Sequence, residues 1–198
     1  MARMFQLTWT GLFPRKARPG QSLFDPSVTR MRVALQDLDS NLHVNNGTYL
    51  QMMDVARNNQ IADLGMFSIA RTKGWAPVVA ASTVKYRRSL RPFERFEITS
   101  RILGWDERMF YMEQVFTRDG LLYARGIIAS RFLDRQNNRI SPLDVVQEVT
   151  GDNVPSPDLP ADVAAWARAM DIAPRQPSTA PSSSPRFLRF EPPQSEET

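Results

Sequence analysis

The residues best suited to chemistry lie in one short segment, LDSNLHVNNGTYL, between Leu38 and Leu50. It contains His43, the single histidine of the chain, four residues after the carboxylate of Asp39, with Asn41 between them. A carboxylate can attack a carbonyl carbon or take a proton from an attacking water, and a neighbouring amide and imidazole can orient that water or hold a ligand. The sequence therefore predicts a catalytic loop made of Asp39, Asn41 and His43.

The segment after this loop can bind a substrate through its backbone. Apolar residues recur at steps of three, four and five over residues 47–64, which predicts a long helix. Asn45 and Asn46 precede its first turn, where an asparagine side chain can accept a bond from an unpaired amide. The amides near Asn46, Gly47 and Thr48 would face a developing oxyanion at the positive end of the helix dipole. We therefore predict that these four residues contact the substrate.

Simpler roles remain open for each residue of the loop. Asp39 and Asn41 can cap turns, and a lone histidine such as His43 is often structural. Asp37, two residues before Asp39, is interpreted as a solvated neighbour or as a supporting partner of that carboxylate. It is the joint occurrence of the three residues at a predicted helix entrance that favours catalysis.

Composition excludes several other mechanisms. The chain has no cysteine, so disulfides, thiolate ligands and cysteine nucleophiles are ruled out. One histidine cannot form a histidine metal cluster, and neither a Gly-x-Ser-x-Gly nucleophile elbow nor a Gly-rich phosphate loop occurs. We expect no metal and no cofactor. A chain without cysteine is compatible with a reducing cytoplasm, which is the location we expect.

The elements around the loop predict an α+β domain. A strand is expected over 31–38, before the helix at 47–64, and Gly65 and Gly74 punctuate the connection that follows. Asp54 and Arg57 on the helix are expected to form a local ion pair. Further strands are expected over residues 78–86, 93–105, 108–117 and 121–133, with an Asp119-Gly120 hairpin turn, then a closing helix or strand over 142–149 and a short helix over 161–170. One helix would thus lie against an antiparallel sheet.

Three segments are expected along the chain. Residues 1–28 form an N-terminal extension, residues 29–150 the domain, and residues 151–198 a C-terminal extension. Pro, Ser, Arg and Glu dominate the end of the chain, which predicts disorder from about residue 173. The first residues lack a signal-peptide pattern, and no apolar run reaches the roughly 20 residues of a membrane helix.

The N-terminal extension carries an apolar pattern of its own. If it is helical, Met4, Phe5, Trp9, Leu12 and Phe13 share one face. Such a face could make weak peripheral contact with a membrane, or it could pack its aromatic rings onto the domain. Both interpretations stay open at this stage.

The charge pattern suggests an anionic ligand. The formal net charge is +4, and arginine supplies most of the positive charge. Lys85, Arg87, Arg88 and Arg91 form a basic cluster that could contact a phosphorylated ligand or an acidic carrier protein. The same cluster could also be a solvent-facing charged edge of the sheet. The excess charge is mild, and we expect no nucleic-acid partner.

The loop resembles that of a known enzyme family. It reads Asp39-x-Asn41-x-His43-Val44-Asn45-Asn46. This run is similar to the catalytic loop of plant acyl-carrier-protein thioesterases, and it resembles more loosely the bacterial 4-hydroxybenzoyl-CoA-type thioesterases, whose catalytic aspartate matches Asp39. With TVKYRRSLRPFERFEITSRILGWDERMFYMEQ at 83–114, residues 29–149 most resemble the thioesterase-superfamily-member proteins of the hotdog fold.

The resemblance implies a fold, an activity and an assembly. It implies a curved antiparallel sheet wrapped around the helix at 47–64, hydrolysis of acyl-CoA or acyl-carrier protein to free acid and thiol, and a homodimer with active sites between subunits. The acyl-carrier-protein thioesterases carry a glutamate before a Tyr-Arg-Arg run, where this chain has Lys85, so Asp39 would act alone. A hotdog dehydratase or hydratase and a non-catalytic acyl-thioester-binding protein are the alternatives. Acyl specificity would depend on pocket residues such as Met52, Met53, Phe67 and Trp75.

Overall fold

The computed structural model describes residues 3–173, which are built on a six-stranded antiparallel sheet. The main strands follow the order β1-β3-β4-β5-β2, and β6 pairs with β5, so β1 and β2 are the outer strands of the main path. The strands are β1 (Ser27–Arg32), β2 (Ala76–Tyr86), β3 (Arg95–Trp105), β4 (Phe110–Arg118), β5 (Leu121–Leu133) and β6 (Arg139–Ile140).

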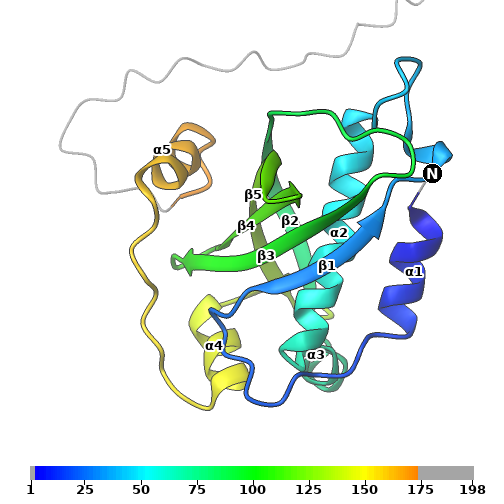
Figure 1. The fold of residues 1–198 in the computed structure, drawn as a ribbon. Helices are drawn as coiled ribbons and strands as arrows, with labels where there is room; N and C mark the ends of the chain where they lie inside the picture. The colour runs from blue at the N-terminus through cyan, green and yellow to red at the C-terminus, as the bar shows by residue number, and fades with distance from the viewer. Residues whose placement is uncertain (1–2, 174–198) are drawn as a thin grey trace, which may run out of the picture.

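One long helix, α2 (Asn46–Asp63), lies across the sheet, which curves around it (Figure 1). The predicted architecture of a curved antiparallel sheet against one helix is thereby confirmed. The short helix α1 runs beside α2, α3 and α4 lie near the lower end of α2 in the view, and α5 lies on the other side of the sheet (Figure 1). The remaining helices are α1 (Met4–Leu12), the 3-10 turn η1 (Leu35–Asp37), α3 (Met66–Lys73), α4 (Pro142–Thr150) and α5 (Ala161–Ala169).

The main core fills the space between α2 and the sheet. Met52, Met53 and Ala56 of the helix are completely buried against sheet residues such as Ile98 and Phe116. Burying each of the larger side chains contributes about 1.5–3 kcal/mol. This packing fixes α2 on the sheet and therefore fixes the position of its N-terminal end.

A glycine lets the helix approach the sheet closely. A Cβ atom on Gly126 of β5 would lie 2.3 Å from Cε of Met53. The absence of a side chain there makes room for Met53 under the helix.

Several local predictions are confirmed. The predicted helix differs from α2 by one residue at each end, and the Asp119-Gly120 turn joins β4 to β5 with both residues at positive φ, 51° and 75°. The undecided closing element is the helix α4, whose N-terminus is capped by Ser141. The short helix expected at 161–170 is α5.

One local prediction is wrong, and one connection contains a helix that was not predicted. The strand expected at 31–38 is β1 at 27–32, because Asp37 accepts a bond from the Ala34 amide (2.7 Å) and the chain turns out of the sheet there. The connection between Gly65 and Gly74 contains helix α3, and these two glycines flank it in the left-handed conformation.

Both extensions are ordered over their described parts. Helix α1 packs against α2 through residues such as Leu7. Val163 and Ala167 of α5 pack on the outer face of the sheet. The predicted disorder concerns residues that lie almost wholly outside the described range. Within residues 3–173, no helix has the length and apolar character needed to cross a bilayer.

Candidate functional site

The predicted catalytic loop closes on itself before α2 begins. Leu38 and Val44 form an isolated antiparallel bridge, and the Asp39 amide donates to the His43 carbonyl (2.8 Å). Leu42 at the tip has a φ of 57°, in the left-handed region. The Val44 amide donates to the Leu90 carbonyl (3.0 Å), which ties the loop to the segment after β2.

The Asp39 side chain organises this turn. Its Oδ1 accepts bonds from the amides of Asn41 (2.8 Å) and His43 (3.3 Å), and the residue is half-buried. The structure thus brings Asp39, Asn41 and His43 together in one turn. The contacts join the Asp39 side chain to the backbone amides of Asn41 and His43. Both bonds are accepted by Oδ1. Asp39 can therefore cap the turn through Oδ1 and still have a chemical role through Oδ2.

Asn45 caps α2, as the sequence predicted. Its Oδ1 accepts from the Gly47 amide (2.8 Å), and its carbonyl accepts from the Thr48 amide (2.9 Å). Asn45, Asn46 and Gly47 are exposed, whereas Thr48 is buried. The positive end of an 18-residue helix therefore opens onto the loop.

A small cleft of about 240 Å³ adjoins this helix end. Tyr86 at the end of β2 donates from its hydroxyl to the Asn46 carbonyl (3.1 Å), and its ring meets that of Tyr49 edge-on at 5.1 Å. Burial raises the pKa of both tyrosines. The cleft is lined by Val44, Asn46, Tyr49, Tyr86, Arg87, Arg88 and Ser89.

Three predicted binding residues, Asn46, Arg87 and Arg88, thus share this cleft. Sequence reasoning did not assign Tyr49 and Tyr86 to the site. The one sequence signal for Tyr86 was its place in the Tyr-Arg-Arg run.

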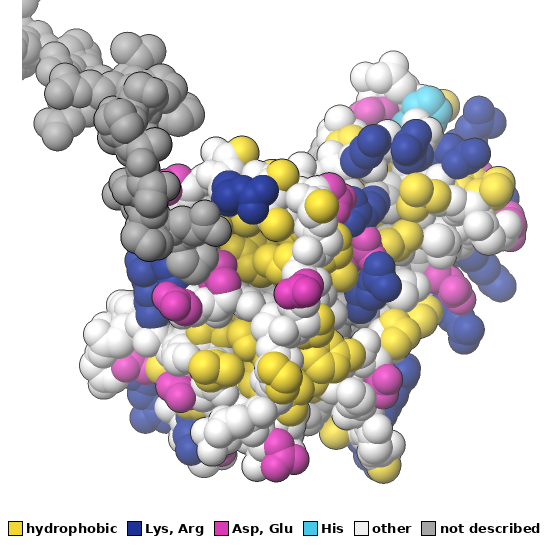
Figure 2. Space-filling view, turned by 90° about the vertical axis from the view of Figure 1, so that its left-hand side faces the viewer, with side chains coloured by type: hydrophobic (Ala, Val, Ile, Leu, Met, Phe, Trp, Pro, Cys, Tyr) yellow, Lys and Arg dark blue, Asp and Glu magenta, His cyan; other side chains and the backbone are white. Residues whose placement is uncertain are grey.

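A second, basic groove of about 460 Å³ lies on the other side of Arg88. Figure 2 shows Lys and Arg side chains gathered around the cyan histidine. Arg118 is paired with Glu94, and Arg88 donates to the Leu122 carbonyl (2.7 Å), so the groove walls are held in place. The groove is lined by His43, Arg88, Ser89, Arg91, Glu94, Arg118 and Tyr123.

Lys85 lies away from these two clefts. It stands opposite Arg125 in the β2–β5 register, and the Arg125 guanidinium bonds Asp162 of α5. Directly opposed residues of an antiparallel pair share a face, so Lys85 projects toward the α5 side of the sheet. Tyr86, the next residue, faces α2. The structure therefore separates Lys85 from Arg87 and Arg88.

Asp37 is not a solvated neighbour of Asp39. Its side chain is fully buried and binds Arg3 through two bonds, Nε to Oδ1 (3.0 Å) and Nη2 to Oδ2 (2.5 Å). The Arg3 guanidinium also donates to the Arg32 carbonyl (2.8 Å). Asp37 therefore holds the start of the loop against the N-terminal extension.

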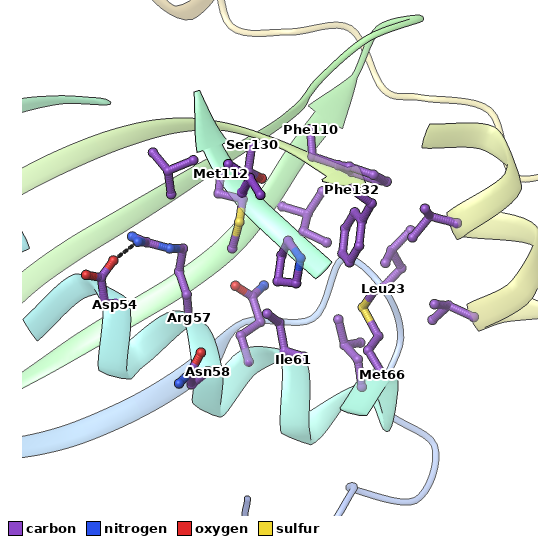
Figure 3. A pocket seen from close by; sticks show the side chains of 18 of the residues that line it. Leu23, Asp54, Arg57, Asn58, Ile61, Met66, Phe110, Met112, Ser130 and Phe132 are labelled. Carbon is purple, nitrogen blue, oxygen red and sulfur yellow. Dashed lines mark hydrogen bonds and ion pairs between the residues drawn. The ribbon is translucent and has the colours of Figure 1, made fainter. Parts of the chain in front are cut away.

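An apolar cavity of about 210 Å³ lies under the C-terminal half of α2 (Figure 3). In Figure 3, Ile61 and Met66 face it from the helical side, and Phe110 and Phe132 from the sheet. Its polar rim includes the Asp54–Arg57 ion pair, which the sequence predicted. Burial lowers the pKa of Arg57 to about 10, so its guanidinium is charged at neutral pH.

Strand β2 forms one wall of this cavity. Pro77, Val78 and Val79 line it, and the two valines are also exposed at the edge of the sheet. Met52 and Met53, expected in the acyl pocket, are packed in the main core instead. Gln60 lies fourteen residues beyond Asn46 on α2, which is about 21 Å at a rise of about 1.5 Å per residue.

Among residues 3–173, no group of three His, Cys, Asp or Glu side chains is placed to hold a metal ion. The loop offers a carboxylate, an imidazole and a helix N-terminus, and the neighbouring groove adds the exposed guanidinium groups of Arg88 and Arg91.

A curled antiparallel sheet around one long helix, with a polar loop at the start of that helix, defines a hotdog fold. Solved structures agree. The probable thioesterase YbaW from Escherichia coli aligns with a TM-score of 0.59 at 24% identity, over 62% of this chain and 95% of YbaW. BH1999 gentisyl-coenzyme A thioesterase aligns with a TM-score of 0.56 at 21% identity, over 61% of this chain and 98% of that protein.

The chain belongs to the thioesterase-like superfamily, whose family model matches residues 33–167. It is similar to protein THEM6 of Danio rerio, with 36% identity over 161 residues, which are 81% of this chain and 78% of that protein. The hotdog fold and the thioesterase family expected from the loop motif are thereby confirmed.

Proposed function

We propose that this protein hydrolyses an acyl thioester to a free acid and a thiol, with Asp39 as the catalytic carboxylate. The observation that carries the proposal is that Asp39 lies in a hydrogen-bonded turn just before α2 together with His43, which lines the basic groove. Membership in the thioesterase-like superfamily supports it.

The chemistry requires little beyond these groups. A water oxygen adds to the acyl carbon, the C–S bond breaks, and the proton taken from water passes to the departing thiolate. A thiolate is a good leaving group because the pKa of a thiol is about 8.5. Asp39 would act either as the base that takes the water proton or as a nucleophile that forms a mixed anhydride. Asn41 and His43 would hold the water or the thioester, and the α2 N-terminus would favour the oxyanion.

We assign coenzyme A as the first thiol to test. Arg88 and Arg91 line the groove beside His43, and guanidinium groups suit phosphates. One structural neighbour is named a coenzyme A thioesterase, which agrees with this choice. An acidic carrier protein would use the same charges, so acyl-carrier protein is the second substrate to test.

The working unit in this proposal is a homodimer joined through β2. This strand is an edge of the sheet, and nine of its eleven residues are exposed although most are apolar or small. An unpaired, apolar edge strand is suited to pair with another copy of itself. Antiparallel pairing centred on Ser82 would place Val78 beside Tyr86 of the partner subunit.

Such a dimer would complete the active site. The cavity wall at Val78 and Val79 and the cleft at Tyr86 lie at opposite ends of β2 in one protomer. The proposed pairing brings the apolar cavity of one protomer to the Asp39 loop of its partner. A thioester at that loop could then extend its acyl group into the partner's cavity.

A substitution on the exposed edge tests this assembly. Ser82→Lys would place like charges face to face at the two-fold axis, which disfavours pairing. We expect a monomer by sedimentation, with thermal stability close to wild type and at least tenfold lower kcat/KM. A variant that stays dimeric and fully active would contradict this interface.

Two alternatives are separated by one assay. A hotdog hydratase would add water across an enoyl thioester, and a binding protein would hold acyl thioesters without cleaving them. Wild type and Asp39→Ala are incubated with saturated and enoyl acyl-CoAs, while released thiol, hydrated product and ligand binding are measured. Thiol release that Asp39→Ala loses while binding persists supports hydrolysis. Equal, slow release from both proteins with retained binding would refute it.

The N-terminal helix supports a further, peripheral contact. Phe5, Trp9 and Phe13 form a ladder of rings, with centroids 6.1 and 4.6 Å apart, and all three are more than half exposed. The alternative in which these rings pack onto the domain is therefore wrong. We propose that this face touches a membrane surface, because exposed Trp and Phe suit the lipid interface.

Vesicle sedimentation tests that contact. Wild type should co-sediment with vesicles containing anionic lipid, and a Phe5→Ser, Trp9→Ser, Phe13→Ser triple variant should not. Equal sedimentation of the two proteins would refute the membrane contact without affecting the proposed hydrolysis.

A further inference from the structure

The apolar cavity contains one polar side chain that its own protomer leaves unsatisfied. Gln60 is 1% exposed, and neither Nε2 nor Oε1 has a hydrogen-bond partner among the described residues. Two other polar side chains of the lining are engaged, since Arg57 binds Asp54 and Gln114, and Asn58 binds Thr10. Gln60 is therefore an unpaired polar group of this lining, which also includes the hydroxyl of Ser130.

An orphaned amide of this kind is unusual. Most buried side-chain polar atoms in folded proteins have a partner, and each exception calls for an explanation. A second copy of the chain cannot supply the partner, because Gln60 is enclosed within its own protomer. Gln60 belongs to the lining of the cavity, whose wall also includes Val78 and Val79 on the exposed edge of β2.

We propose that Gln60 recognises a hydroxyl group on the acyl part of the substrate, far from the thioester. A carboxamide offers one donor and one acceptor side by side, and a hydroxyl can accept from Nε2 and donate to Oε1 together. The remainder of the lining, including Ile61, Met66 and Phe132, is apolar and suits the carbon skeleton. This inference rests on the proposed thioesterase function and names its substrate class.

The size of the cavity limits the acyl group. A protein cavity of about 150 Å³ accommodates benzene. The cavity here, about 210 Å³, has room for one substituted aromatic ring or for a medium-length aliphatic chain. A distal hydroxyl on either skeleton would meet Gln60 with the same chemistry.

The test uses matched acyl groups that differ by one oxygen. The aromatic pair is benzoyl-CoA and 4-hydroxybenzoyl-CoA, and the aliphatic pair is octanoyl-CoA and 8-hydroxyoctanoyl-CoA. Both pairs are assayed with wild type and Gln60→Met, which keeps side-chain length but removes the hydrogen-bonding atoms. Binding of the corresponding non-hydrolysable thioether analogues is measured by calorimetry, so that recognition is read apart from catalysis.

Wild type should favour the hydroxylated member of at least one pair by tenfold or more in both kcat/KM and Kd, because a buried polar group rejects a ligand that leaves it unpaired. Gln60→Met should lose this preference and bind the deoxy member at least as well as wild type does. The pair that shows the preference identifies the skeleton as aromatic or aliphatic.

Two results would overturn the inference. If wild type hydrolyses both members of each pair equally and Gln60→Met behaves the same, Gln60 binds only water and the thioesterase proposal survives. If wild type binds the hydroxylated analogues preferentially but Gln60→Met does too, another residue reads the hydroxyl. Failure of the proposed function is a different outcome, in which no thioester of either pair is cleaved while binding and its dependence on Gln60 can still be measured.

Discussion

The two ends of helix α2 are built for opposite tasks. At its N-terminus, the turn amides are satisfied by Asp39 and Asn45, and the surroundings are open, polar and basic. Toward its C-terminus, the helix covers an apolar cavity in which a buried amide, that of Gln60, has no partner among the described residues. In the proposed function, the first end would present charge and hydrogen bonds to the thioester, and the second would offer an apolar volume to the acyl carbon skeleton.

The difference teaches how the site is divided. Asn46 at the first end and Gln60 near the second are about 21 Å apart along the helix axis. If the Asp39 loop is the chemical half of the proposed site and the cavity its recognition half, the two lie too far apart in a single protomer to meet across a short acyl group. In the proposed homodimer, pairing of β2 with a second copy would join the halves.

The largest effect is expected at the N-terminal end, from Asp39→Asn. An asparagine oxygen can still accept from the Asn41 and His43 amides, so the turn should persist while the carboxylate is lost. We expect kcat for acyl-CoA hydrolysis to fall by roughly 100- to 10,000-fold, the usual contribution of a general base. A loss of less than threefold would remove Asp39 from the chemistry.

Asp37, the neighbouring carboxylate, should affect stability more strongly than Asp39 does. Asp37→Asn breaks a buried ion pair with Arg3, and removing one partner of such a pair costs about 3–5 kcal/mol. We expect the free energy of unfolding, from chemical denaturation, to fall by about that amount, whereas Asp39→Asn should change it by less than about 1 kcal/mol. Equal stability losses would erase the distinction between the two aspartates.

A smaller effect is expected in the basic groove. Arg91→Ala should raise KM for acyl-CoA by roughly tenfold, the loss of one charge-assisted phosphate contact. KM for an N-acetylcysteamine thioester, which has no phosphates, should stay unchanged, and high salt should reduce the difference. Arg71→Ala is the matched control, because Arg71 is an exposed residue of α3, at the opposite end of α2 from the groove. Equal changes for both substrates would place Arg91 outside phosphate binding.

The smallest effect is expected from alkaline pH. Burial raises the pKa of Tyr49, so above pH about 10 the unfolded state releases this proton while the folded state keeps it. The folded state then binds more protons, and the free energy of unfolding falls as pH rises, by at most about 1.4 kcal/mol per pH unit. Tyr49→Phe should therefore lose less stability than wild type between pH 10 and about 11. Parallel curves for the two proteins would contradict this cause.

Local features of the site could be predicted from sequence. Asn45 was recognised as the helix cap because its type and its position before an apolar 3.6-residue pattern are both local signals. The Asp119-Gly120 turn and the Asp54–Arg57 pair were predicted for the same reason. The placement of Asp39, Asn41 and His43 in one turn likewise depends on only five consecutive residues.

Features made by distant segments could not be predicted. Asp37 looked solvated because its partner, Arg3, lies 34 residues earlier in the chain. The cavity combines α2, β2, β5 and α4, and no one-dimensional pattern reveals that these meet around Gln60. The side of β2 that carries Lys85 became clear only from its register with β5.

The central claim, that one protomer's carboxylate works with its partner's cavity, is tested most directly by mixed dimers. Asp39→Asn and Ile61→Trp, which fills the cavity, are co-expressed with different tags, and the heterodimer is purified. Both parent homodimers should be inactive, while the heterodimer retains one intact site and about half of the wild-type activity. A heterodimer as inactive as its parents would show that each site lies within a single protomer, and would contradict the claim.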